Sequence, residues 1–274
     1  MKKLIVIADW AEDTLAQSEV KIAINGFLDT DKSADISFVH SQPSTFHTGF
    51  LLLQLSNTVE RYGNPQNTVF FVNTDPRNHT ETGVRLSHGA KGVIALLISG
   101  CYVIGPNAGY SFSLIKNKIK RLFYYQPLDK GSQFRSRDNY PRIISALLES
   151  QEQDLELEEI DINNIPETRG FKVGHIDNYG NIKTTITLDD FKGKANLNEE
   201  ITVIINGIKQ KAVFTDNMFG QEPNKLVIFP GSSGKPDNPF LEIAVRLDFD
   251  KTDTTNNAAS IFKYPSPGDE IIIK

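Results

Sequence analysis

Leu4-Ile5-Val6-Ile7-Ala8, near the start of the chain, is an unbroken apolar run that stops at Asp9. An uninterrupted run of this kind is typical of a strand buried on both faces, as in a parallel sheet. Apolar residues then recur at helical spacing over residues 14–28. The stretch therefore predicts a β-strand followed by a helix, which is the repeating unit of an α/β fold.

The alternation of strand and helix patterns continues through the first half of the chain. Strand patterns at 36–39 and 68–72 flank a helical pattern at 48–62. Residues 93–98 and 102–104 predict either a hairpin or two further strands, and 138–150 predicts a helix with Pro141 in its first turn. We expect an α/β N-terminal domain over residues 1–150, with a mostly parallel sheet flanked by helices.

The composition changes after this domain. Residues 149–161 are strongly acidic, and we interpret 151–168 as a linker; the alternative is a solvated acidic helix end. From 169 to 274 helical periodicity almost vanishes, and short β-rich runs alternate with turn residues. Asn206-Gly207 between two such runs is a strong hairpin signal. This half predicts an antiparallel sandwich or barrel.

Composition narrows the function classes. The 274 residues suit two domains, and 39% hydrophobic with 23% charged residues is an ordinary globular profile. No apolar run approaches the ~20 residues of a membrane span. A single cysteine, Cys101, excludes an intramolecular disulfide, and a net charge of −5 disfavours nucleic acid as a partner. We expect a cytoplasmic protein with no membrane or nucleic-acid partner, no cofactor and no metal ion.

Two carboxylates follow apolar strands: Asp9 after the first and Asp75 after the third. In open α/β sheets, ligands bind beyond the carboxyl ends of the strands. An aspartate there either caps the next helix or accepts the hydroxyls of a ribose. Two such residues, each ending a strongly apolar strand, favour the second interpretation.

Common catalytic and nucleotide motifs are absent. The sequence has no Gly-x-Gly-x-x-Gly after the first strand, no phosphate-binding loop and no Gly-x-Ser-x-Gly elbow; residues 231–234, Gly-Ser-Ser-Gly, predict a turn. His79 and His88 share a polar loop, where solvated histidines are the simpler interpretation than a metal site. Residues 177–181 between two strands predict a plain hairpin turn, and 256–259 a loop.

Six stretches, taken in order, carry a more specific signal. They are Asp9-Trp10 with Lys21; Val-Asn-Thr-Asp-Pro at 72–76; Tyr-Val-Ile-Gly-Pro-Asn-Ala-Gly at 102–109; Phe-Arg-Ser-Arg-Asp at 134–138; His-Ile-Asp-Asn-Tyr-Gly-Asn-Ile at 175–182; and Phe-Leu-Glu-Ile-Ala-Val at 240–245 with Asn257-Ala258-Ala259. Together they resemble the S-adenosyl-L-methionine (SAM) hydroxide adenosyltransferase family, which is related to the fluorinase and chlorinase enzymes.

The resemblance implies an α/β domain, a C-terminal β-barrel and a homotrimer, with the ligand between one subunit's N-terminal domain and its neighbour's C-terminal domain. Asp9 would hold the ribose hydroxyls, and Asp177 with Ser232 and Ser233 would meet the methionine ammonium and carboxylate. The remaining substrate-binding positions it implies are the aromatic Phe134, Tyr179 and Phe219 and the polar Ser136, Asn181 and the Asn257-Ala258 backbone.

The family reaction is displacement at the ribose C5′ by water or hydroxide, which yields adenosine and methionine. An Asp, an Arg and a His hold the water. Asp75 stands at the Asp position, while Arg135 replaces the His, and the Arg position falls on Thr82, Arg85 or Lys91. We take Asp75, Lys91 and Arg135 as the catalytic candidates. The expected function is SAM hydrolysis; the alternative is a non-catalytic binder of adenosine or SAM. Halide is a disfavoured nucleophile because the Asp75 carboxylate would repel it.

Overall fold

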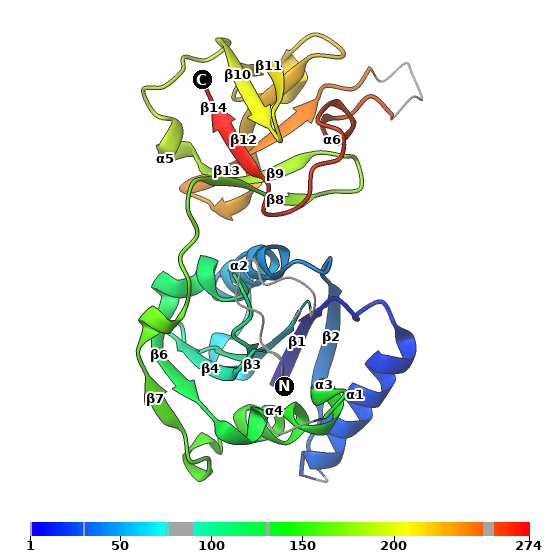
Figure 1. The fold of residues 1–274 in the computed structure, drawn as a ribbon, viewed down its shortest axis with the longest axis vertical. Coiled ribbons are helices and arrows are strands. Elements are labelled where there is room, and N and C mark those ends of the chain that lie inside the picture. Colours follow the sequence, from blue (N-terminus) through cyan, green and yellow to red (C-terminus); the bar gives the residue numbers. More distant parts are fainter. Residues whose placement is uncertain (1, 30, 75, 77–89, 130–131, 249–254) are drawn as a thin grey trace. The chain divides into compact units, whose positions relative to one another are not determined.

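The computed structural model describes residues 2–29, 31–74, 76, 90–129, 132–248 and 255–274. The chain divides into two compact units, Met1–Thr168 and Arg169–Lys274. Figure 1 shows the first as a sheet with helices and the second as a small barrel.

The first unit is built on a seven-stranded sheet in the order β2-β1-β3-β5-β4-β6-β7. Strands β2 (Ala34–His40), β1 (Lys2–Ala8), β3 (Thr68–Asn73) and β5 (Tyr102–Pro106) are parallel. Strands β4 (Gly92–Leu97), β6 (Ile119–Tyr124) and β7 (Glu158–Ile160) continue the sheet in antiparallel pairs. The predicted α/β class is confirmed, and β4 with β5 forms the predicted hairpin.

Helices cover both faces of this sheet (Figure 1). On one face, α1 (Thr14–Phe27) and α4 (Tyr140–Leu148) bury Val20, Ile24 and Ile144 against β1 and β3. On the other, α2 (Thr45–Tyr62) buries Leu52 and Val59. The helix predicted at 138–150 corresponds to α4, with Pro141 in its first turn as expected. A short helix that was not predicted, α3 (Arg135–Asp138), precedes α4 and is separated from it by Asn139.

Residues 151–168, interpreted from sequence as a linker, carry regular structure within the first unit. They contain β7 and two 3₁₀ helices, η4 (Glu152–Asp154) and η5 (Ile162–Asn164). Ile165 is buried in the core beside α2. Four further 3₁₀ helices are η1 (Pro65–Asn67), η2 (Ser113–Lys118), η3 (Gln126–Asp129) and, in the second unit, η6 (Met218–Gly220).

The second unit is a closed barrel in the order β10-β11-β12-β13-β9-β8-β14. Its strands are β8 (Phe171–Ile176), β9 (Ile182–Thr187), β10 (Glu200–Ile205), β11 (Ile208–Phe214), β12 (Leu226–Lys235), β13 (Asn238–Val245) and β14 (Glu270–Ile273), with short helices α5 (Leu188–Phe191) and α6 (Ala258–Ile261). Asn206 and Gly207 both have positive φ, +50° and +77°, so the predicted two-residue hairpin joins β10 to β11. The pairs are antiparallel except β11 with β12, which is parallel.

None of the helices in the described part of the chain has the length and apolarity needed to cross a membrane.

Candidate functional site

The carboxyl ends of β1 and β3 place several predicted residues at one edge of the first sheet. Asp9 directly follows β1, and Asn73 ends β3, where its Nδ2 donates to Ser136 Oγ over 2.5 Å. Trp10 packs edge-on against Phe134, with ring centroids 5.5 Å apart. The predicted Asp9, Phe134 and Ser136 therefore lie together, at the edge where α/β sheets bind ligands.

Buried hydroxyl groups fix the backbone that leads to Asp75. Thr48 Oγ1 donates to Thr74 Oγ1 over 2.7 Å and lies 2.8 Å from Ser41 Oγ, and all three side chains are buried. Ser44 caps the same helix, α2, by accepting from the His47 N–H. The residue before Asp75 is thus held rigidly. Asp75 lies outside the described residues, as do Thr82, Arg85, His79 and His88.

The two cationic candidates meet around Asp129 at this edge. Arg135 Nη1 donates to the Ala90 carbonyl over 3.0 Å and lies 3.8 Å from Asp129 Oδ1. Asp129 also accepts from the Gly92 N–H and the Tyr124 hydroxyl, at 2.7 and 2.9 Å. The exposed Lys91 places its Nζ 5.1 Å from the centre of the Tyr124 ring. Lys91 and Arg135 therefore form one positively charged corner beside the strand ends.

Tyr124 is kept neutral in this corner. Its hydrogen bond to Asp129, followed by burial, raises the pKa of the phenol above its ordinary value. An arginine guanidinium does not lose its proton in proteins. Neither group can therefore act as a base near neutral pH, although both can orient an oxygen atom.

In the barrel, the predicted turn at 177–181 is confirmed between β8 and β9. Asp177 Oδ1 accepts from the N–H groups of Tyr179 and Asn181 at 2.9 and 3.0 Å, and Oδ2 accepts from Asn181 Nδ2 at 3.1 Å. Tyr179 projects outward, with 69% of its surface exposed. Two predicted ligand-binding residues, Asp177 and Asn181, thus support each other, leaving an exposed aromatic ring at the tip.

This turn packs against the start of α6. The Ala259 N–H donates to the Gly180 carbonyl over 2.9 Å. Gly180 has φ +77°, and a Cβ atom there would lie 2.3 Å from Asn257 Oδ1, so only glycine permits the approach. Asn257 caps α6 by accepting from the Ser260 N–H over 2.9 Å. The loop predicted at 256–259 is therefore a capped helical turn, and Asn257-Ala258 lies beside the Asp177–Asn181 turn.

Lys183 and Glu242 form an ion pair that the sequence interpretation missed. Lys183 Nζ lies 2.6 Å from Glu242 Oε1 and 2.9 Å from Ser232 Oγ. Glu242, which is 6% exposed, also accepts from the Ser232 N–H over 2.8 Å. The sequence does carry a signal for this ion pair, because Glu242 is a charged residue within the apolar run 240–245. A carboxylate in a buried strand needs a partner.

Ser232 and Ser233 do not lie in the turn that the sequence predicts. Residues 231–234 are an irregular stretch of β12, with shifted register against β13, and are not a turn. A Cβ atom on Gly231 would lie 2.2 Å from Glu242 Cγ, so glycine lets the strand pass over the carboxylate. Ser232 binds the ion pair, and the buried Ser233 Oγ has no hydrogen-bond partner within the described ranges.

His175 and Phe219 complete the barrel's candidate residues. Burial, then the positive charge of Lys183, lowers the pKa of His175 below its ordinary value, which keeps the imidazole neutral near pH 7. Phe219 lies in η6, 62% exposed, with its N–H bound to Asn217 Oδ1. Among the described residues, no three His, Cys, Asp or Glu side chains gather as metal ligands.

Comparisons with known proteins support the fold. No protein-family model matches the chain, and no curated protein matches it. Among the solved structures that match, two are similar over the whole length. An uncharacterized conserved protein from Thermotoga maritima has a TM-score of 0.73 and 18% identity, covering 99% of this chain and 100% of its own. A conserved hypothetical protein from Thermus thermophilus has a TM-score of 0.67 and 16% identity, and the match covers 100% of both chains. At these identities the likeness shows that the two-unit fold is shared.

Proposed function

We propose that this chain binds SAM and hydrolyses it to adenosine and methionine. One observation carries the proposal: residues distant in sequence, Asp9, Phe134 and Ser136, come together at the carboxyl edge of the sheet, next to the rigidly held Thr74. The α/β unit followed by a closed barrel is also the fold that the family resemblance implies.

The two candidate groups suit the two ends of SAM. A carboxylate such as Asp9 accepts ribose hydroxyls, and flat rings such as Phe134 stack on a base. On the barrel, the Asp177 carboxylate would accept from the methionine ammonium, and the hydroxyl groups of Ser232 and Ser233 would donate to the methionine carboxylate. In line with the resemblance, we expect a homotrimer, which light scattering on a gel-filtration column would measure.

In the proposed reaction, a water oxygen attacks C5′ of the ribose as the bond from C5′ to sulfur breaks. The sulfonium leaves as neutral methionine, and the water proton passes to Asp75 or to solvent. Because the leaving group is already good, the protein's contribution is alignment and exclusion of bulk water. Lys91 and Arg135 would orient the attacking oxygen without exchanging protons.

One observation favours a second candidate, a binder without turnover. The Arg135 guanidinium, at the position of the family's histidine, is directed to the Ala90 carbonyl and Asp129. In this arrangement it stabilises the strand ends. A protein that keeps the contacts to the nucleoside, but in which Arg135 only stabilises the fold, would bind adenosine or SAM without forming products.

The deciding experiment is incubation of the purified protein with SAM, with chromatography of adenosine and methionine. Hydrolysis predicts equal amounts of both products. Asp75→Ala should lower turnover at least ~100-fold, the usual scale for a group that handles the reacting water, and leave adenosine affinity nearly unchanged. The exposed Asp216→Ala is the matched control. Undiminished turnover in Asp75→Ala would refute the catalytic assignment, whereas adenosine binding without product over hours would establish the binder.

A further inference from the structure

The first unit has a pocket at the edge of its sheet opposite to the candidate site. Its lining includes Lys2, Thr68 and Tyr102, which are the first residues of β1, β3 and β5. The candidate SAM site lies at the other ends of the same parallel strands. The pocket is therefore a separate feature that the proposed function does not use.

The pocket is large enough for a small molecule and has one apolar wall. Its volume is about 270 Å³, and Val69, Leu96, Leu147 and Leu148 form the apolar side. At ~30 Å³ per water molecule, that space equals roughly nine waters, which is comparable with the nine non-hydrogen atoms of leucine. The three residues Val69, Leu147 and Leu148 are buried, so this wall is part of the folded core.

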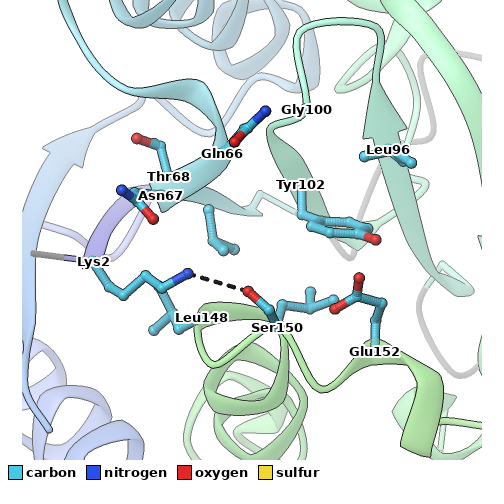
Figure 2. Close-up of a pocket in the computed structure, with 12 residues that line it drawn as sticks. Lys2, Gln66, Asn67, Thr68, Leu96, Gly100, Tyr102, Leu148, Ser150 and Glu152 are labelled. Carbon is cyan, nitrogen blue, oxygen red and sulfur yellow. Dashed lines mark hydrogen bonds between the residues drawn. The ribbon is translucent and has the colours of Figure 1, made fainter.

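The pocket also contains a carboxylate, Glu152, with one oxygen atom that lacks a donor in the described part of the chain. Glu152 Oε2 is buried and has no hydrogen-bond partner among the residues that the structure describes. Leaving a buried charged acceptor unpaired is costly. Tyr102 faces Glu152 across the pocket (Figure 2). Burial, next the charge of Glu152 and then a side-chain hydrogen bond with Glu152 raise the pKa of this phenol to about 12, so it stays neutral.

The pocket also contains a cation, Lys2, which contacts the segment that carries Glu152. Lys2 Nζ donates to Ser150 Oγ over 3.2 Å, as Figure 2 shows, and Ser150 is two residues from Glu152. An ammonium has three donor hydrogens, so Lys2 can bind another acceptor. Within the described ranges neither Lys2 nor Glu152 forms an ion pair. Two side chains of opposite charge, Lys2 and Glu152, thus line a pocket that also has apolar lining residues.

We propose that this pocket binds a free α-amino acid with an apolar side chain of about the size of leucine. The ligand ammonium would bind Glu152, its carboxylate would bind Lys2, and its side chain would lie against Leu96 and Leu148. A free amino acid combines an ammonium, a carboxylate and an apolar side chain, which matches a pocket lined by Glu152, Lys2 and leucine side chains.

Isothermal titration calorimetry with three probes tests this proposal. The probes are L-leucine, 3-methylbutylamine, which lacks the carboxylate, and 4-methylpentanoate, which lacks the ammonium. L-leucine should bind saturably at millimolar concentrations or below, and each of the other two at least about tenfold more weakly. Glu152→Gln and Lys2→Met should each weaken leucine binding by about 10- to 100-fold.

Matched controls are Glu156→Gln and Lys3→Met, which change neighbouring residues outside the pocket and should leave the affinity as in the wild type. If circular dichroism shows that one of the two pocket variants does not fold, the leucine affinity of the other variant still tests the proposal. Absent leucine binding, binding equal in the pocket variants and the wild type, or amine binding as tight as leucine would each overturn the proposal. These results do not depend on SAM turnover.

Discussion

Breaking the ion pair in the barrel should destabilise that unit strongly, and Lys183→Met is the simplest change that does so. The substitution keeps the length of the side chain and removes its charge. Glu242 would then remain 6% exposed, accepting only from Ser232 among the contacts described above. A buried carboxylate without its cation is a large unfavourable term.

The expected size of the effect is about 2–3 kcal/mol. Removing one partner of a buried pair costs about 3–5 kcal/mol. The Lys183 side chain is 17% exposed, and the Ser232 N–H and hydroxyl still bind Glu242, so the value falls below that range. Since about 1.4 kcal/mol is a factor of ten, slowly exchanging barrel amides should exchange roughly 30- to 150-fold faster.

Hydrogen exchange followed by mass spectrometry measures this directly on peptides from β9 and β13, independently of the first unit. Lys183→Met combined with Glu242→Gln should recover at least half of the lost protection, because a neutral amide needs no counter-charge. The control is Lys192→Met, whose ion pair with Asp189 is exposed and should contribute no more than about 0.5 kcal/mol. The reasoning would be refuted if the amides of Lys183→Met were as well protected from exchange as those of the wild type. It would also be refuted if the double variant were less protected than the single one.

Two further changes test other contacts. The lowered pKa of His175 means that the unfolded chain binds a proton more readily, so the barrel should lose stability as pH falls below about 6.5. His175→Gln should flatten this dependence in urea unfolding followed by circular dichroism; an unaltered pH profile would contradict it. Thr48→Val removes the donor to Thr74 and should cost about 1–3 kcal/mol in unfolding followed by the fluorescence of the single tryptophan. The exposed Thr58→Val should change it by less than about 0.5 kcal/mol.

The fold was largely predictable because each strand carries its own signal. The run from Leu4 to Ala8 lies in β1, and Asn206-Gly207 closes a hairpin, since both features are set by local patterns. Local patterns did not predict the short helix α3 before Asn139 or the irregular strand at 231–234. The second depends on Glu242, a partner ten residues away that no turn rule includes.

The candidate site was predictable only in part. Asp9, Phe134 and Ser136 were found from strand ends and from the resemblance, and the structure brings them together. The ion pair of Lys183 was missed because its partner Glu242 lies on the neighbouring strand β13, far away in the sequence. The pocket at the opposite edge was missed for the same reason: Lys2 and Glu152 are 150 positions apart and line one pocket only after the sheet forms.

The acidic stretch that follows α4 has a consequence for how molecules of this protein meet one another. It supplies β7, the last strand of an open sheet, and its Glu158 and Glu159 are exposed, with Glu159 bound to Arg121 over 2.7 Å. An open edge offers unpaired backbone groups to any passing strand. Two copies approaching by this edge would set glutamates against glutamates, so the negative charge protects the sheet from growing between molecules, and added salt would weaken that protection.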